Sequence, residues 1–336
     1  MYQIGQMDEM NLKWGIVGAG QIVSRWIRGA RQAGVTVEAI ASRTLERAQT
    51  AAQAYEIPRV LGCGDLVAAP DIDIVYIATP HPSHKQWTIE ALRHGKHVLV
   101  EKPAAVTAGD FREMAETARL NGCFLMEAMW TAFFPAWDFT LRLIADGAIG
   151  GLQRLDASFG FEVGFDPGSR LFNPDLAGGS LLDVGVYNLH LAERLLGDAV
   201  EMKPKVLLGE TGVDETADIE IFYAHGLRAR LRSSIREQLP NKAVITGTKG
   251  VLELPVFWSP TRVVLRNAGV GEKNYDFPIP QPFGGSGDEG FQYEIRHVEE
   301  CIAAGRLESP VLPHALTERV LSVCDRLRAQ WNEGIC

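Results

Sequence analysis

The stretch HVLVEKP at residues 97–103 decides the fold. The aliphatic run at 98–100 is typical of a parallel strand that is covered on both faces. Pro103 has no backbone N–H for a sheet and biases Lys102 towards an extended backbone, so the strand ends here. Glu101 and Lys102 therefore stand at the carboxyl end of a strand, where open α/β sheets bind ligands. Taken alone, such a sequence is more often a solvated surface turn, and the rest of the chain decides between the two interpretations.

A glycine turn between a strand and a helix lies near the start of the chain. Residues 12–17 predict a short strand, Gly18-Ala19-Gly20 follows directly, and apolar residues then recur at helical intervals. In this setting Gly18 permits a tight turn, and Gly20 lets the backbone approach a pyrophosphate at the helix N-terminus. Val23 replaces the third glycine of the dinucleotide-binding motif. The alternative is a plain strand–helix turn.

The end of the second predicted strand, at 35–41, indicates which dinucleotide is bound. A site for NAD would place an acidic residue there for the ribose 2′-hydroxyl. The chain instead continues with Ser42 and Arg43, and Arg47 follows. A hydroxyl and a guanidinium suit a 2′-phosphate, which predicts NADP(H) over NAD(H). The alternative is that Arg43 is solvated in the first turn of the next helix.

Strands and helices continue to alternate through the first 130 residues. Further strands are predicted at 74–78, 98–100 and 124–128, and helices at 45–55, 83–93 and 107–120. This alternation is typical of a doubly wound parallel sheet with right-handed crossovers. We therefore expect residues 1–130 to form an α/β Rossmann domain that binds NADP.

Two histidines, His81 and His84, follow the strand at 74–78 at a spacing that would suit a metal pair. No third ligand stands nearby, so we predict no metal site. The two imidazoles are expected to line the mouth of the site or to cap the next helix. Each is equally explained as a hydrogen-bonded structural histidine.

The pattern changes near residue 150, where β-like segments come close together. They are predicted at 153–162, 200–208, 217–223, 227–235, 242–247, 251–254 and 262–266. Polar and apolar residues alternate at 218–223, which indicates a mostly antiparallel sheet with one covered and one open face. We expect residues 131–336 to form a separate α+β domain, whose last helix, at about 316–331, is free to pack back on the first domain.

A helix predicted from about Leu182 carries the candidates for proton transfer. It follows a loop with Gly178 and Gly179, and Asp183 and Tyr187 lie one turn apart on it. His190 lies near the same face. An acid, a phenol and an imidazole on one exposed face form a plausible proton-transfer group. The alternative is an aspartate that complements the helix dipole and a tyrosine that is merely packed.

The composition argues against several classes of protein. The chain has 336 residues, a formal net charge of −9 and no basic stripe, which argues against nucleic-acid binding. No apolar run approaches the ~20 residues of a membrane-spanning helix. Residues 1–11 lack the features of a secretory signal. The five cysteines form no CxxC pair, so we expect reduced thiols in a cytoplasmic protein.

These motifs together resemble the glucose-fructose oxidoreductase/inositol dehydrogenase (Gfo/Idh/MocA) family. The resemblance rests on the strand–GxG–helix start, on the EKP motif at 101–103 and on the GG…D…Y segment at 178–187, and it spans nearly the full chain. Within the family, HPSH at 81–84 and FLMEAMW at 124–130 are most similar to the dimeric dihydrodiol dehydrogenases and the NADP-dependent D-xylose dehydrogenases.

The resemblance implies roles for individual residues. It makes Lys102 the lysine near the nicotinamide and the reacting hydroxyl, Asp183 the aspartate of the helix motif, and Tyr187 the catalytic tyrosine. Cofactor contacts are expected from Gly18, Gly20, Gln21, Ile22, Ser42, Arg43, Thr79, His81, His84, Glu101 and Lys102. Substrate contacts are expected from Trp130, Phe159, Tyr187, His190 and Phe283. The resemblance also implies that the second domain binds the substrate and forms a homodimer through its sheet.

We therefore predict an NADP-dependent dehydrogenase that transfers a hydride between NADP and a secondary alcohol of a small polyhydroxylated ring. Tyr187 is the expected acid–base group, with its pKa lowered from ~10 by the ammonium of Lys102. The expected substrate is an aldopyranose such as D-xylose or D-glucose, or a trans-dihydrodiol, stacked on Trp130 and Phe159. The alternatives are an NAD-dependent glycosidase of the same family and an NADP-binding regulator without turnover.

Overall fold

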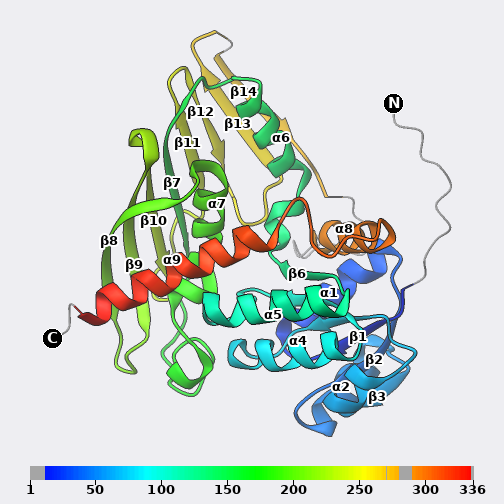
Figure 1. The fold of residues 1–336 in the computed structure, drawn as a ribbon. Coiled ribbons are helices and arrows are strands. Elements are labelled where there is room, and N and C mark those ends of the chain that lie inside the picture. Colours follow the sequence, from blue (N-terminus) through cyan, green and yellow to red (C-terminus); the bar gives the residue numbers. More distant parts are fainter. Residues whose placement is uncertain (1–11, 270, 280–289, 334–336) are drawn as a thin grey trace, which may run out of the picture.

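The computed structural model describes residues 12–269, 271–279 and 290–333, which form two sheets in succession along the chain (Figure 1). The first sheet is parallel throughout, with the strand order β3-β2-β1-β4-β5-β6. Its strands are β1 (Trp14–Val17), β2 (Val37–Ala41), β3 (Arg59–Leu61), β4 (Ile74–Ile77), β5 (His97–Glu101) and β6 (Leu125–Ala128). The predicted doubly wound Rossmann sheet is thus confirmed.

Helices cover both faces of this sheet because its strands are apolar on both faces. They are α1 (Gln21–Ala33), α2 (Leu45–Tyr55), α3 (Cys63–Ala68), α4 (His84–Arg93), which the short turn η1 (His81–Ser83) precedes, and α5 (Ala108–Asn121). In β5, Leu99 is fully buried in one apolar core, whereas Val98 and Val100 are fully buried in the other. The apolar run of β5 therefore has the environment that its sequence predicts.

A second sheet follows after the turn η2 (Trp130–Phe133) and α6 (Pro135–Ala145). Its strands are β7 (Leu152–Gly160), β8 (Ala199–Leu208), β9 (Asp214–Tyr223), β10 (Arg228–Ser234), β11 (Ala243–Gly247), β12 (Gly250–Leu254), β13 (Arg262–Asn267) and β14 (Gly271–Asp276). In the order β14-β13-β12-β11-β7-β10-β9-β8, β7 and β10 pair in parallel and the other neighbours are antiparallel. The expected mostly antiparallel sheet is confirmed. The sequence pattern does not predict α6 or the polar, mostly exposed β14.

The second sheet has one apolar face and one charged face. On β9, Ile219 and Ile221 are buried on the face against which α7 (Val186–Leu196) packs. Asp218 directly precedes Ile219, points to the opposite face and pairs with Arg232 of β10 at 3.6 Å. The alternation along this strand therefore separates a covered face from an open one, as predicted.

The chain closes with two helices, α8 (Phe291–Ala303) and α9 (His314–Glu333). Helix α8 lies against α1 so closely that a Cβ on Gly29 would be 2.4 Å from the Cβ of Phe291. On α9, Arg328 donates to the Val106 carbonyl at 2.6 Å, and the same helix packs against α7. The last helix therefore contacts both halves of the chain, while the boundary at residues 130 and 131 stays a prediction. In the described part of the chain, no helix combines the length and apolarity needed to cross a membrane.

Candidate active site

The turn after β1 has the shape that a dinucleotide needs. Gly18 has a φ of +127°, and a Cβ there would lie 2.3 Å from the Ala78 carbonyl oxygen, so only glycine fits. Gly20 caps α1, and a Cβ there would meet no atom within 4 Å. The first turn of α1 carries no acidic residue. The N-terminus of α1 thus combines open space with backbone N–H groups, which suits a pyrophosphate.

The other residues predicted around this turn gather at the same edge of the sheet. Thr79 is the second residue after β4, and its backbone nitrogen would lie 3.1 Å from a Cβ on Gly18. Its Oγ1 is buried and has no hydrogen-bond partner among the described residues. Ser42 is half-buried at the end of β2, and at the start of α1 Gln21 is exposed and Ile22 half-buried. The unpaired hydroxyl and the open turn fit a bound dinucleotide.

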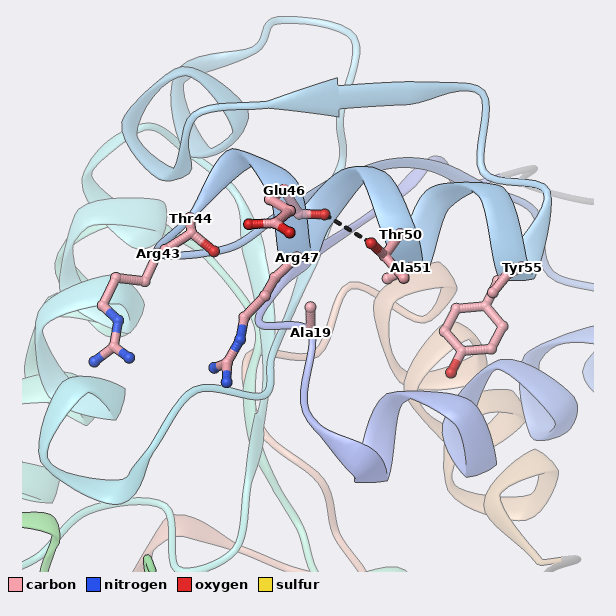
Figure 2. A pocket seen from close by; sticks show the side chains of 9 residues that line it. Ala19, Arg43, Thr44, Glu46, Arg47, Thr50, Ala51 and Tyr55 are labelled. Atoms are coloured by element: carbon pink, nitrogen blue, oxygen red, sulfur yellow. Dashed lines mark hydrogen bonds between the residues drawn. The ribbon is translucent and has the colours of Figure 1, made fainter. Parts of the chain in front are cut away.

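Arg43 and Arg47 line a cavity of about 560 Å³ beside the glycine turn. Ala19 of that turn and Tyr55 of α2 line the same cavity, as does Glu46. Figure 2 shows both guanidinium groups extending on the same side of the chain. Two guanidinium groups beside the end of β2 offer paired donors to a phosphate.

His81 and His84 lie at the start of α4, with ring centroids 5.7 Å apart. His84 is fully buried, and its ring nitrogens face the carbonyl oxygens of Thr79 at 2.8 Å and Pro103 at 2.9 Å. A side chain without exposed surface offers no atom to a cofactor, so His84 fits the structural interpretation: it ties the end of β4 to the end of β5. Among the described residues no three His, Cys, Asp or Glu side chains are grouped as a metal site.

His81 lies where the two halves of the chain meet. Its Nδ1 is 3.4 Å from the carbonyl oxygen of Ala177, which belongs to the connection between β7 and α7. Burial, and then the neighbouring charges of His84 and Lys102, lower the pKa of His81 to about 3. The imidazole is therefore neutral at physiological pH, and its neighbour Lys102 places it at the edge of the site.

Lys102 and Asp183 join the two halves of the chain. The Lys102 ammonium donates to the Asp183 carboxylate at 3.2 Å and to the Asp183 backbone carbonyl at 2.5 Å. Lys102 follows β5 directly, whereas Asp183 lies on a π-helical turn, η4 (Leu181–Gly185), that leads into α7. The two side chains are 15% and 5% exposed, so solvent ions screen their attraction only weakly.

Arg170 is a second cation on Asp183, and the sequence gives no sign of it. Its guanidinium donates to the same carboxylate oxygen at 2.8 Å. Burial alone would raise the pKa of Asp183, but the charges of Lys102 and Arg170 outweigh burial and hold it below its usual range. Asp183 is therefore ionised. Arg170 lies in an irregular segment between β7 and α7, where no periodicity marks a site.

The phenol of Tyr187 lies beside Lys102. The ammonium is 5.2 Å from the ring centroid, and the Tyr187 hydroxyl accepts a hydrogen bond from Trp130 Nε1 at 3.3 Å. Burial, reinforced by the charge of Glu101, raises the pKa of Tyr187 well above its usual value of ~10. The expectation that Lys102 lowers this pKa is therefore wrong for this state. The reason is geometric: the ammonium is turned towards Asp183, and the phenol is enclosed.

The helix face that was expected to be exposed is buried. Asp183, Tyr187 and His190 have only 4%, 8% and 2% of their surface exposed. Burial, with the charges of Arg194 and Arg319, lowers the pKa of His190 to about 3. His190 is thus neutral, and the charges near it are those of Arg194, towards the C-terminal end of α7, and Arg319 of α9. No hydrogen bond connects it to Tyr187 among the described residues, so it does not join the proton-transfer group.

Aromatic rings surround the Tyr187 phenol on one side. Phe159 meets the Tyr187 ring edge-on, with centroids 5.3 Å apart, and stacks on Trp258 at 5.3 Å and 6°. Phe159 was predicted here, whereas Trp258 was not. Trp258 lies in an irregular connection between β12 and β13, and only the tertiary structure brings it to the site.

A second group of rings continues this wall. Trp130 stacks on Phe291 of α8 at 4.3 Å and 16°, and the guanidinium of Arg25 lies 5.3 Å from the Trp130 ring. Trp130 was predicted as a substrate residue, whereas Phe291 and Arg25 were not. The predicted substrate residue Phe283 lies outside the described residues.

Glu101 faces the interior of the first half of the chain. It accepts a hydrogen bond from the Tyr76 hydroxyl at 2.5 Å and one from the Lys102 backbone N–H at 3.2 Å. Burial raises the pKa of Glu101, and these partners oppose the rise. Glu101 is 8% exposed and bonded to protein groups, so its observed part is to anchor the end of β5.

Two properties of this site define a class of protein. An open glycine turn on a Rossmann sheet suits a dinucleotide, and an ammonium beside a phenol is a pair that can take part in proton transfer, as in NAD(P)-dependent oxidoreductases. Residues 12–129 match the family model "Oxidoreductase family, NAD-binding Rossmann fold", and residues 140–253 match "GFO/IDH/MocA C-terminal domain". The chain belongs to the GFO/IDH/MocA oxidoreductase family.

Known relatives and solved structures agree with this assignment. The chain is 36% identical over 329 residues to trans-1,2-dihydrobenzene-1,2-diol dehydrogenase of Xenopus tropicalis, covering 96% of this chain and 98% of the relative. The 3-ketoreductase KijD10 from Actinomadura kijaniata, in complex with NADP and TDP-benzene, superposes with a TM-score of 0.83 at 25% identity, covering 95% of this chain and 97% of that one. The aldose-aldose oxidoreductase from Caulobacter crescentus superposes with a TM-score of 0.83 at 28% sequence identity, covering 96% of this chain and 98% of that one. The chain is thus an oxidoreductase acting on CH–OH groups, related to dihydrodiol and sugar dehydrogenases.

Proposed function

We propose that this protein transfers a hydride between NADP(H) and a secondary alcohol carbon of a small polyhydroxylated ring. The observation that carries the proposal is the placement of the Lys102 ammonium 5.2 Å from the Tyr187 ring, from opposite halves of the chain. Removing a hydride from a CH–OH carbon also requires the hydroxyl proton to leave. A phenolate, which a nearby ammonium favours over the neutral phenol, can receive that proton.

The residues of the site divide this work. When bound, NADP supplies the nicotinamide carbon that accepts or donates the hydride. Tyr187 moves the proton to or from the substrate oxygen, and Lys102 donates to that oxygen as charge develops on it. Asp183, ionised between Lys102 and Arg170, keeps the ammonium charged and oriented.

The raised pKa of Tyr187 supports one direction more directly than the other. With its pKa far above neutral, the phenol is protonated at rest and is ready to donate to a carbonyl oxygen, as reduction requires. Oxidation requires a lower pKa, which a closer cation would supply. Lys102 is the neighbouring cation, and it would have to turn from Asp183 towards the phenol.

The walls of the site support a ring-shaped substrate. Phe159 and Trp258, which stack on each other beside Tyr187, are half-buried, whereas Trp130 is almost fully buried and donates to the Tyr187 hydroxyl. Aldopyranoses such as D-xylose or D-glucose, and trans-dihydrodiols, both have apolar faces beside polar edges and so suit such a wall. The names of two similar proteins state a dihydrodiol and aldoses as substrates.

The cofactor preference is proposed from Arg43 and Arg47. Both line the cavity beside the glycine turn, and a guanidinium pair favours the 2′-phosphate of NADP over the 2′-hydroxyl of NAD. The similar 3-ketoreductase is described with NADP.

A substrate panel tests the proposal. The purified protein is supplied with NADP and a series of aldopyranoses and trans-dihydrodiols, NADPH formation is followed by absorbance, and the series is repeated with NAD. We expect turnover with NADP on at least one ring substrate and much slower turnover with NAD. A flat trace across the panel would contradict the proposal: it would favour the glycosidase alternative if a glycoside supplied in a parallel assay is cleaved, and a regulator if it is not.

We also propose that two copies pair through the open face of the second sheet. Lys203, Glu220, Arg230 and Asp156 stand side by side on β8, β9, β10 and β7, with alternating charge. Opposite charges on neighbouring strands neutralise each other. A face neutralised in this way can approach its own copy without net repulsion.

A further inference from the structure

A buried carboxylate at the start of β9 holds the segment that carries Asp183. The carboxylate of Asp214 accepts hydrogen bonds at one oxygen from the Leu181 backbone N–H at 2.6 Å and from the Ser180 hydroxyl at 2.9 Å. The Ser180 hydroxyl also lies 3.0 Å from the hydroxyl of Ser233 on β10. Asp214 is 7% exposed, so these are internal bonds that water does not replace.

Gly179 lies against the same carboxylate. It has a φ of +117°, and a Cβ there would lie 2.1 Å from the other oxygen of Asp214. Its own carbonyl accepts a backbone hydrogen bond from Asp183 at 3.4 Å. The close approach of Asp214 therefore explains why glycine stands at this position, and one turn of chain connects that contact to Asp183.

We propose that Asp214 is a positioning residue, which sets where the π-helical turn η4 begins and thereby where Asp183 meets Lys102. The inference rests on the proposed function of that pair. Registration matters here because a shift of one residue turns a helical side chain by roughly 100° about the helix axis. Such a rotation would carry Asp183 away from Lys102. π-Helical turns often occur at functional sites, and they need such outside support.

The charge state of Asp214 agrees with this role. Burial raises the pKa of Asp214 to about 6, and the bonds from Leu181 and Ser180 oppose the rise. The carboxylate is therefore ionised at neutral pH, and it is the ionised form that accepts both bonds.

Substitution of Asp214 tests the proposal. In Asp214→Ala we expect kcat to fall by ~10- to 100-fold, because a displacement of about 1 Å at a reacting group has such an effect. The dissociation constant for NADPH should stay within about twofold, because the glycine turn and Arg43 belong to the other sheet. Asp214→Asn keeps one oxygen that can accept both bonds, so it should recover most of the lost kcat.

A matched control separates positioning from general loss of stability. Glu193 is a buried carboxylate on α7 that accepts from the Tyr223 hydroxyl at 2.9 Å and pairs with Arg319 at 3.3 Å. Glu193→Ala should lower Tm comparably while leaving kcat within about threefold. Equal loss of kcat in the Asp214 and Glu193 variants, or an unchanged kcat in Asp214→Ala, would overturn the proposal.

Two further measurements keep the test decisive. If Asp214→Ala does not fold, Ser180→Ala removes only one of the two bonds, and it should lower kcat in the same direction; an unchanged kcat would count against the proposal. A crystal structure of the folded variant gives a readout that needs no substrate: the distance from Lys102 Nζ to Asp183 Oδ1 should grow by more than ~1 Å. That distance decides the role of Asp214 even if no sugar or diol is turned over, in which case the proposed function alone fails.

Discussion

The ammonium of Lys102 is bonded twice to Asp183, at 3.2 Å to its carboxylate and at 2.5 Å to its backbone carbonyl, although 81 residues separate the two in sequence. Lys102 directly follows strand β5 of the first sheet, and Asp183 lies in the π-helical turn η4, which leads into the helix that packs on the second sheet. This bond places the two candidate proton-transfer groups, Lys102 and Tyr187, at one site. In the state described, it also turns the ammonium away from the phenol, so the ammonium does not offset the burial and the Glu101 charge that raise the pKa of Tyr187.

The first prediction concerns the phenol. Tyr187→Phe should lower kcat by ~10² to 10⁴, because the proton of the reacting hydroxyl loses its donor or acceptor. NADPH should still bind with nearly unchanged affinity, as measured by fluorescence titration. The variant removes only one hydrogen bond, from Trp130, so Tm should change little. A variant with near-normal kcat would remove Tyr187 from the mechanism.

The second prediction concerns the ammonium. Lys102→Met should lower kcat by ~10²-fold or more, because the developing charge on the substrate oxygen loses its donor. Asp183 would then keep Arg170 as its cation, so its pKa should rise from the lowered value, which NMR of the labelled carboxyl can follow. Lys85→Met is the matched control: Lys85 pairs with Asp110 and should leave kcat unchanged. Similar losses in the two variants would contradict the assignment.

The third prediction concerns the cofactor. Arg43→Ala should raise the KM for NADP by ~10-fold or more and leave the KM for NAD nearly unchanged, because only NADP has the phosphate that the guanidinium would bind. Arg47→Ala should act in the same direction. Arg59→Ala, which removes an exposed ion pair with Asp71 at the amino end of the edge strand β3, serves as the control. Equal changes in the KM for NADP and for NAD would show that neither arginine binds the 2′-phosphate.

The fourth prediction concerns stability and pH. Burial raises the pKa of Glu193 to about 7, whereas in the unfolded chain it is ~4.3. Between these values the folded chain holds a proton that the unfolded chain has lost, so this group lowers stability as pH rises through that window. Glu193→Gln should remove about 1 to 3 kcal/mol of that decline, measured as the difference in unfolding free energy between pH ~4.5 and ~7. A decline as steep in the variant as in the wild type would contradict the role.

The fifth prediction concerns assembly. Light scattering at micromolar concentration should give the mass of two chains. Arg230→Glu should shift that mass towards one chain, since it sets three like charges side by side on the open face, with Glu220 and Asp156. Arg119→Glu, on the exposed side of α5, should leave the mass unchanged. A single-chain mass for the wild type would rule out the proposed pairing.

Local sequence patterns were enough to predict most of the secondary structure. The run at 98–100 is buried between two cores, and the alternation along β9 separates a covered face from an open one. Both follow from side-chain periodicity, which the local sequence contains in full. β14 was not predicted because its sequence, GEKNYD, has no regularly spaced apolar residues. It is a strand only because it pairs with β13.

The candidate site was predicted less completely than the fold. Lys102, Asp183, Tyr187, Trp130 and Phe159 come from motifs, and the structure brings them together. Arg170 and Trp258 lie in irregular connections that no period or motif marks, so their place at the site depends on how distant segments pack. His84 and His190 were expected to contact ligands, but a linear pattern does not show that packing encloses both.

The sequence by itself determined which backbone segments form strands and helices, and where the glycine turn and the lysine stand on the first sheet, because these depend on neighbours within a few residues. Only the tertiary structure decided that the Lys102 ammonium binds the Asp183 carboxylate, that Arg170 binds the same carboxylate, and that the pKa of Tyr187 rises instead of falling. Those outcomes depend on burial and on charges carried by segments far apart in the chain, and both exist only once the two halves have packed together.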